Sequence, residues 1–267
     1  MNTDLSQQIV AQLKQTRKYR FLCEDTLFRV ARWAQVRYGA LKPAVKVAKR
    51  KLHQVYGAYL ESGHLDRVDA LVEALPADAP PEQIRATCRQ VLQCHASTAE
   101  RLPLLDRFYS DLFERIGRPR SLLDLACGLH PFALPWMGLG PQVDYYACDI
   151  DLRVTASLRR FFSRVGQCAE AVCQDILVDL PNREVDVAFL LKTLPCLEQQ
   201  EKGVGLELLR QLRASCLVVS FPNQSLGGRR KGMAEHYDAV MARILDHLQA
   251  KVHRMAYAEE TIYVLEK

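Results

Sequence analysis

The first third of the chain shows the hydrophobic pattern of amphipathic helices. Apolar residues recur there every three or four positions, as expected for helices that bury one face. This pattern predicts helices at residues 5–16, 25–38, 43–59 and 65–75. Gly39, Gly63 and the stretch 76–81, which contains three prolines, interrupt the pattern and separate the helices.

The helix expected at 43–59 is the most informative of the four. Pro43 suits its first turn. Its apolar stripe is formed by Val45, Ala48, Leu52, Val55 and Tyr59. Its basic residues, Lys46, Lys49, Arg50 and His53, fall on another face. A solvated surface is the simplest reading of that face, and binding to a polyanion is the functional one.

From about residue 100 the pattern changes to short apolar runs that alternate with helical stretches. The runs predict strands at 121–125, 144–148, 170–173, 185–191 and 216–221, with helices at 101–116, 152–165, 197–212 and 233–248. A last pair of runs, 252–257 and 261–265, predicts a hairpin at the sheet edge. We therefore expect an α/β fold, a doubly wound sheet with an antiparallel edge, in a domain at 94–267 that follows a helical domain at 1–93.

Composition is that of a globular protein. Of 267 residues 49% are hydrophobic and 25% charged, and no apolar run approaches the roughly 18 residues of a membrane span. The first residues lack the charged-then-apolar order of a signal peptide, so we expect a cytoplasmic protein without a membrane partner. The nine cysteines lack the C-x2-C spacing of a zinc site, so reduced thiols and no metal are expected.

Charge is distributed unevenly along the chain. Residues 1–60 contain twelve Lys or Arg against three Asp or Glu and carry +9, which leaves −4 for the remainder at a total of +5. A basic module joined to a mildly acidic body indicates a polyanion partner, and nucleic acid is the leading candidate. A membrane surface is the alternative, but the apolar stripe at 43–59 lacks the bulky aromatic content of an interfacial anchor.

The end of the first expected strand has the composition of a nucleotide site. The run LLDLACG at 122–128 is apolar and ends in small residues, which allow a ligand to approach the backbone. Leu129, His130 and Pro131 follow Gly128, so the G-x-G-x-x-G loop that binds a pyrophosphate is missing. NAD and FAD are disfavoured. S-adenosylmethionine has no phosphate and tolerates such a loop.

Two aspartates follow the next two strands. Asp149 lies 21 residues after Gly128, at the position where an acidic side chain accepts hydrogen bonds from ribose hydroxyls. Asp175 follows the third strand and is placed to accept from an adenine amino group. Either residue alone is more often a turn or a helix cap. Together they indicate an adenosine site.

Two further loops lie at the carboxyl ends of strands, where an open sheet builds its ligand crevice. The first is LKTLP at 191–195. The second, at 221–233, combines an aromatic residue, glycines and three successive cations, a mixture suited to an RNA backbone beside an extruded base. An ordinary surface loop is the alternative.

These segments resemble the Arm and Rmt family of 16S rRNA methyltransferases, which confer aminoglycoside resistance. The similar runs are HASTAERL at 95–102, LDLACGLHP at 123–131, LKTLP at 191–195, SFP at 220–222, SLGGR at 225–229 and KGM at 231–233. KLHQ at 51–54 and YGAY at 56–59 are similar to the helical extension of that family. Two departures are His130, where many relatives have Asn, and Ala99, where several have Lys.

The resemblance implies a class I methyltransferase that uses S-adenosylmethionine and docks on the assembled small ribosomal subunit. Arg101 would hold the cofactor's carboxylate, Gly128 would lie beside its methionyl part, and Asp149 and Asp175 would bind ribose and adenine. The full expected cofactor set is Arg101, Ala126, Gly128, Asp149, Ile150, Asp175, Ile176 and Leu191. The expected RNA set is Lys14, Lys18, Arg20, Lys46, Lys49, Arg50, His53, Arg229, Arg230, Lys231 and Met233.

The implied reaction is methylation of a guanine at N7 in the decoding site of 16S rRNA. That nitrogen has a free lone pair, so no catalytic acid or base is expected. Two alternatives stay open. One is methylation of another rRNA position, such as adenine N1. The other is a non-catalytic RNA-binding or ribosome-assembly protein that has kept the fold.

Overall fold

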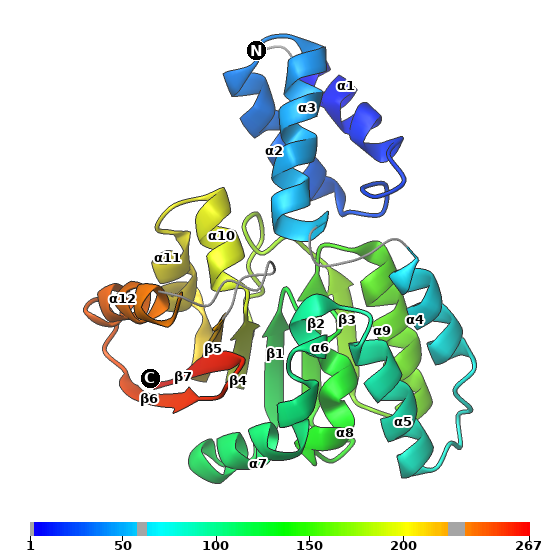
Figure 1. The fold of residues 1–267 in the computed structure, drawn as a ribbon, viewed down its shortest axis with the longest axis vertical. Helices are drawn as coiled ribbons and strands as arrows, with labels where there is room; N and C mark the ends of the chain where they lie inside the picture. Colours follow the sequence, from blue (N-terminus) through cyan, green and yellow to red (C-terminus); the bar gives the residue numbers. More distant parts are fainter. Residues whose placement is uncertain (1–2, 58–62, 224–232) are drawn as a thin grey trace.

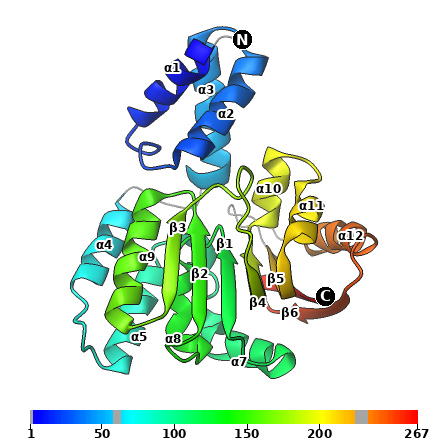
Figure 2. The same ribbon diagram turned by 180° about the vertical axis from the view of Figure 1, so that it is seen from behind.

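A seven-stranded mixed sheet forms the body of the protein (Figures 1 and 2). The computed structural model describes residues 3–57, 63–223 and 233–267. Its strands are β1 (Ser121–Leu125), β2 (Asp144–Asp149), β3 (Ala169–Cys173), β4 (Glu184–Leu191), β5 (Arg213–Pro222), β6 (Lys251–Ala256) and β7 (Glu260–Glu266), in the order β3-β2-β1-β4-β5-β7-β6. The first five are parallel, and β7 and β6 form an antiparallel hairpin at the edge. The doubly wound sheet with an antiparallel edge is confirmed.

Strand residues alternate between two hydrophobic clusters, because successive side chains point to opposite faces. Leu122 belongs to one cluster, whereas Leu123 and Leu125 belong to the other. The first face packs against α4 (His64–Glu73), α5 (Pro81–Leu92), α7 (Leu105–Ile116), α8 (Leu134–Met137) and α9 (Leu152–Val165). The second face packs against α10 (Leu194–Gln200), α11 (Val204–Gln211) and α12 (Met233–Leu245).

The first three helices form a separate bundle, which we call the N-terminal module. It contains α1 (Thr3–Lys14), α2 (Glu24–Arg37), α3 (Leu41–Leu52) and the π-helical turn His53–Gly57. Its own apolar cluster includes Ile9, Leu27, Val30 and Ala48, each at most 1% exposed. The module stands over the carboxyl ends of the parallel strands, as Figure 1 shows. It therefore lies at the edge where this class of sheet binds ligands.

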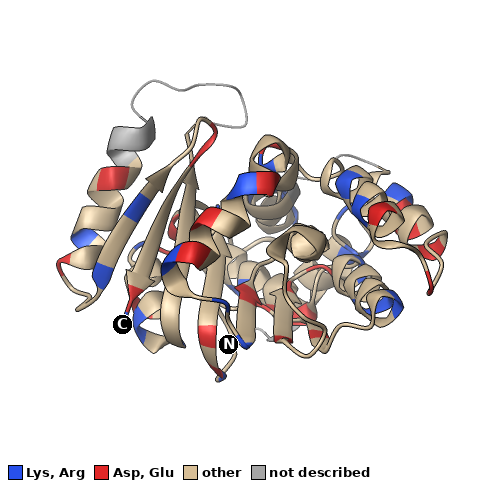
Figure 3. Cartoon of the chain, turned by 90° about the horizontal axis from the view of Figure 1, so that it is seen from below, with Lys and Arg blue, Asp and Glu red and all other residues tan. Residues whose placement is uncertain are grey.

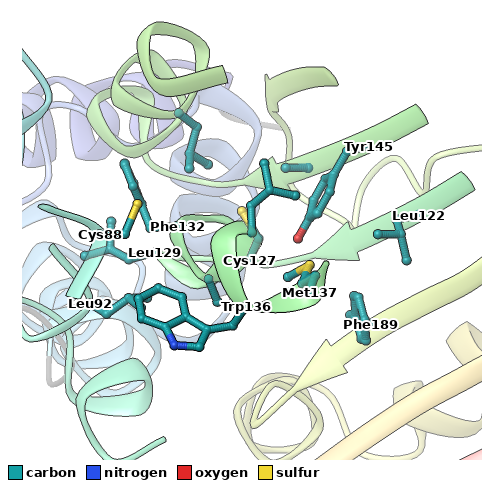
Figure 4. Packing of buried hydrophobic residues seen from close by; sticks show 14 of the residues in the cluster. Cys88, Leu92, Leu122, Cys127, Leu129, Phe132, Trp136, Met137, Tyr145 and Phe189 are labelled. Carbon is teal, nitrogen blue, oxygen red and sulfur yellow. The ribbon is translucent and has the colours of Figure 1, made fainter. Parts of the chain in front are cut away.

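Helices α4 and α5 pack with the sheet, although the sequence grouped them with the basic domain at 1–93. Cys88 and Leu92 of α5 lie against Phe132 and Trp136, which follow β1 (Figure 4). Helix α4 packs along α9. Within the described residues, α4 and α5 thus share the apolar cluster of the sheet, whereas α1 to α3 form a cluster of their own. The sequence pattern predicts no helix at 81–92, because the prolines at 76–81 indicate a break. In the structure Pro81 is the first residue of α5.

Three predicted helices differ most from the observed ones in extent. The expected helix at 197–212 is two helices, because Gly203 has φ +83° and ends the regular backbone between α10 and α11. The expected helix at 43–59 changes to a π-helical turn at His53. The one expected at 101–116 begins at Leu105, after the short turns α6 (Ala96–Ala99) and η2 (Leu102–Leu104).

No helix within the described segments is long and apolar enough to cross a bilayer. Among the same residues no group of three or more His, Cys, Asp or Glu side chains is arranged to hold a metal ion.

Candidate functional site

One cavity lies between the N-terminal module and the carboxyl ends of β1 to β4. The structure brings all eight residues of the expected cofactor set to its wall: Arg101, Ala126, Gly128, Asp149, Ile150, Asp175, Ile176 and Leu191. They come from separate loops, and the sheet order places Asp175, Asp149, Gly128 and Leu191 in sequence along one edge. The segments chosen from the sequence therefore converge on a single place.

The loop after β1 is shaped to bring the backbone close to a ligand. Ala126 and Gly128 both have positive φ, at 48° and 52°. A Cβ on Gly128 would be in ordinary contact with the His95 ring, at 3.5 Å, so a side chain there is disfavoured by the backbone conformation and not by a clash. The φ of Ala126 is uncommon for a residue with a side chain, and such backbone is found mainly at functional sites.

The carboxylate of Asp149 is fixed by two backbone donors. Its Oδ2 accepts from Gly128 N at 2.8 Å and its Oδ1 from Asp151 N at 3.0 Å. Burial raises the pKa of Asp149 to about 6, against the lowering effect of these two N–H groups. Each oxygen keeps a further acceptor position, so the group can accept the two hydroxyls of a ribose when it is ionised.

Asp175 is held by residues of the N-terminal module, which the sequence analysis missed. Its Oδ2 accepts from Thr26 Oγ1 at 2.8 Å and from Arg29 Nε and Nη2 at 2.9 and 2.8 Å. Its Oδ1 accepts from the Leu177 backbone N–H at 3.0 Å. Arg29 also donates to Gln200 Oε1 at 2.8 Å and itself lines the cavity.

A buried charge cluster borders the cavity beside β4. Arg101 donates to both carboxylate oxygens of Glu260, at 2.9 and 2.5 Å, and the two side chains are 2% and 0% exposed. Lys192, whose φ is +58°, pairs with Glu100 at 2.5 Å and lies 3.9 Å from Glu260. Burial opposes ionisation of Glu260, but the charges of Arg101 and Lys192 outweigh it and lower its pKa.

Two histidines lie near the loop after β1, His130 buried and His95 half-buried. Burial, with the charges of Lys192 and Arg101, lowers the pKa of His95 to about 4, so its imidazole is neutral at pH 7. His130 lies between Tyr109 Oη, 2.7 Å from its Nε2, and Asp124 Oδ2, 2.7 Å from its Nδ1; Tyr145 also donates to Asp124. His130, noted above as a departure from Asn, thus has hydrogen-bond partners on both ring nitrogens and lines the cavity.

The expected RNA-binding residues divide into two groups. In the N-terminal module, Lys14, Lys18, Arg20, Lys46, Arg50 and His53 are exposed and Lys49 is half-buried. Lys18 Nζ lies 3.5 Å from His53 Nδ1, and Tyr19 donates to the Lys49 carbonyl, so the segment before α2 lies beside the end of α3. Lys14 is paired with Glu24. Arg229, Arg230 and Lys231 lie outside the described residues, and Met233 is the first residue of α12.

The cavity fits S-adenosylmethionine better than a dinucleotide. Asp149 is available to ribose, Ile150 and Ile176 offer apolar walls for a base, and Arg101 with Lys192 places cations where an amino-acid carboxylate can pair. Leu129, His130 and Pro131 follow Gly128, so the loop after β1 lacks the glycines of the G-x-G-x-x-G loop that binds a pyrophosphate. The fold and this site are those of a Rossmann-like methyltransferase that depends on S-adenosylmethionine.

A family model described as ribosomal RNA methyltransferase (FmrO) matches residues 15–264, and the chain belongs to that family. A 16S rRNA (guanine(1405)-N(7))-methyltransferase of Micromonospora echinospora is 37% identical over 99% of this chain and 97% of its own length. An enzyme of the same name from Serratia marcescens is 34% identical over 84% of this chain and 83% of its own length.

Solved structures agree with this membership. The crystal structure of 16S rRNA methyltransferase RmtF with S-adenosyl-L-homocysteine has a TM-score of 0.87 and 33% identity, and covers 100% of both chains. The 16S rRNA methylase RmtB has a TM-score of 0.81 and 27% identity over 98% of both chains. The similarity therefore includes the N-terminal module as well as the sheet.

Proposed function

We propose that this protein methylates N7 of a guanine in the decoding site of 16S rRNA, within the assembled small ribosomal subunit in the cytoplasm, and thereby gives resistance to aminoglycosides. The proposal rests on one combination of observations. The cavity is lined by Asp149, Asp175 and Gly128, and the chain is similar over nearly its full length to 16S rRNA (guanine(1405)-N(7))-methyltransferases. The cofactor-binding and RNA-binding roles of individual residues are part of this proposal.

The reaction requires the protein mainly to position the base and the cofactor relative to each other. S-adenosylmethionine supplies, when bound, a methyl group on a sulfonium. Guanine N7 is an acceptor with a free lone pair, and its methylation releases no proton, so we assign no general acid or base. Presenting the base at near-attack distance is worth roughly 7–11 kcal/mol of barrier lowering. Asp149, Gly128 and the Arg101 cluster act by fixing the geometry of the cavity.

The N-terminal module supplies the cations for docking. Lys18 and Arg20, before α2, lie beside the end of α3, where Lys18 Nζ is 3.5 Å from His53 Nδ1. Both also line a hollow beside Asp66 of α4 and Asp151 after β2. Extruding a base from a helix costs a few kcal/mol, which backbone contacts of these cations would offset. Arg229, Arg230 and Lys231 are proposed to act with them.

Resistance follows from the product. A methyl group at N7 leaves a fixed positive charge and removes an acceptor from the decoding site. A polycationic drug that docks there is repelled and loses a hydrogen bond.

The deciding experiment incubates the purified protein with labelled S-adenosylmethionine and isolated small subunits, then maps the modified nucleotide by N7-specific chain scission. Scission at one decoding-site guanine is expected. Label at an adenine would establish the adenine N1 alternative, and RNA binding without any transfer would establish the non-catalytic one.

Two variants connect the result to the site. Asp149→Ala is expected to abolish transfer while the melting temperature stays near that of the parent, and the exposed residue Asp246 offers a matched Asp→Ala control that retains activity. Expression of the parent, but not of Asp149→Ala, is expected to raise the tolerance of a susceptible bacterium to decoding-site aminoglycosides.

A further inference from the structure

The N-terminal module meets the sheet domain along a seam made of the loops after β2 and β3 and of helix α10, which follows β4. In the loop after β2, Ile150 O accepts from Cys23 N at 2.8 Å, and Leu152 N donates to Phe21 O at 2.9 Å. At the end of α10, Lys51 Nζ donates to Gln199 O at 2.9 Å. After β3, Asp175 is bound by Thr26 and Arg29. The same three segments contribute Ile150, Gln200 and Asp175 to the cavity wall.

Asp175 connects the cavity wall to the N-terminal module. It is 3% exposed, and three of its four hydrogen bonds come from side chains of α2, a helix of the RNA-docking module. Arg29, from α2, reaches the cavity itself and holds Gln200 as well. Ile150, in the loop after β2, packs against the apolar cluster of the module and also lines the cavity. The module therefore forms part of the wall expected to hold the adenosyl group.

We propose that Arg29 and Thr26 are positioning residues that couple cofactor binding to docking on the ribosomal subunit. With cofactor in the cavity, the wall formed by Asp175, Arg29 and Ile150 is held in one arrangement. This fixes α2, and with it the basic face of the module, relative to the sheet. The inference rests on the proposed rRNA substrate for its docking partner.

Two physical arguments support this assignment. A buried carboxylate is stable only while its donors are in place, so Asp175 and α2 have to move together or stay together. Linkage then requires reciprocity: if cofactor raises the affinity for the subunit by some factor, the subunit raises the affinity for cofactor by the same factor.

The test measures this factor without relying on turnover. The dissociation constant of the protein from isolated small subunits is determined with and without saturating S-adenosylhomocysteine, and that of S-adenosylhomocysteine with and without subunits. Each pair of dissociation constants gives a ratio, the value without the other ligand divided by the value with it. For the parent we expect the two ratios to agree and to be at least about fivefold, the usual lower range for coupled sites. Arg29→Ala and Thr26→Val are expected to reduce both ratios toward one, with Arg29→Lys between Arg29→Ala and the parent.

Arg32 provides the matched control, because it lies on the same helix and is exposed, with its guanidinium over the Phe28 ring. Arg32→Ala removes the same charge from the module but leaves the seam intact, so it is expected to keep the parent ratio even where its affinity for subunits falls. Melting temperatures of all variants identify any that are misfolded, and Thr26→Val removes a bond to Asp175 without a change of charge.

Two results would overturn the coupling. One is equal subunit affinity with and without S-adenosylhomocysteine in the parent protein, and the other is a parent-like ratio in Arg29→Ala and Thr26→Val. Failure of the proposed function looks different: the parent would bind S-adenosylhomocysteine but neither bind nor methylate small subunits.

Discussion

Asp149 controls the cavity through its state of ionisation. Its pKa is raised to about 6, chiefly by burial, so the carboxylate is charged above that pH and becomes protonated below it. Protonation removes acceptor capacity that the Gly128 N–H and a ribose hydroxyl both need. Affinity for S-adenosylhomocysteine, measured by calorimetry, is therefore expected to be constant from pH 7 to 8 and to fall below pH 6, by at most about tenfold per unit.

The neighbouring groups sharpen this pH test. His95 has its pKa lowered to about 4 by burial and nearby cations, and so does not titrate between pH 5 and 7. Asp151, whose pKa is also raised by burial, is bonded to Tyr56 and to the first turn of α9. The Asp149→Asn variant is expected to bind S-adenosylhomocysteine weakly at every pH. A profile that still fell below pH 6 in this variant would assign the titration to Asp151.

The buried pair of Arg101 and Glu260 has two separable roles. Arg101→Met leaves Glu260 uncompensated except by Lys192 at 3.9 Å, so we expect a loss of about 3–5 kcal/mol in the free energy of unfolding. It should also abolish S-adenosylhomocysteine binding, because the proposed partner of the cofactor carboxylate is gone. Urea denaturation and calorimetry measure the two effects.

The double variant Arg101→Met, Glu260→Gln separates stability from binding. With both charges removed, most of the stability is expected to return, since no unpaired ion remains buried. Cofactor binding is expected to stay lost. Recovery of binding in the double variant would show that Arg101 only neutralises Glu260.

The residues that could be predicted from the sequence are those whose role is set by their own strand. Gly128, Asp149 and Asp175 each follow an apolar run, and the fold rule places such positions at one edge. Arg29 and Glu260 could not be predicted, because their partners, Asp175 and Arg101, lie 146 and 159 positions away in the sequence. Lys192 falls within the noted run 191–195, yet only its φ of +58° and its buried ion pair mark it as unusual.

At the scale of elements, the turn between α10 and α11 depends on one glycine. Gly203 has φ +83°, and a Cβ added there would meet nothing within 4 Å. Gly203→Ala therefore tests backbone conformation without a steric clash, and is expected to lower the free energy of unfolding by about 1–2 kcal/mol. Gly39→Ala, where φ is not in the left-handed region and space is also open, is the control. An equal effect of both would contradict the conformational explanation.

Elements were predictable where a hydrophobic period was uninterrupted. All seven strands were expected in the right places, because each is a short apolar run bounded by turn residues. Helix α5 was missed, since its signal is a proline in the first turn, and prolines also end helices. That α4 and α5 bury their apolar faces against residues after β1 and on α9 could not be predicted either, because it depends on tertiary packing.

At the scale of the whole molecule, charge and architecture separate the two tasks. The basic residues of the module lie over the cavity edge of the sheet. Seen from the opposite end, Lys and Arg are mixed with Asp and Glu (Figure 3). The +9 charge of residues 1–60 thus favours the approach of a polyanion from the end where the module lies, and the loops at that end are those that build the cavity.

This arrangement predicts how charge reversal will act. Lys49→Glu with Arg50→Glu, at the end of α3, is expected to weaken binding to small subunits and to flatten its dependence on salt, because fewer counterions are released. Binding of S-adenosylhomocysteine should be unchanged, since neither side chain lines the cavity. Filter binding at several salt concentrations and calorimetry measure the two quantities.

The control has the same change in net charge at the other end of the molecule. Arg118 and Arg120 are exposed and directly precede β1, at the amino ends of the strands, and their reversal to Glu leaves the module untouched. If docking depends on the module, this pair should reduce subunit affinity far less than Lys49→Glu, Arg50→Glu. Equal losses from the two pairs would mean that only net charge matters, and equal loss of cofactor binding would indicate misfolding. A selective loss would place the rRNA on the same edge of the sheet as the cavity, which the transfer of a methyl group to a base requires.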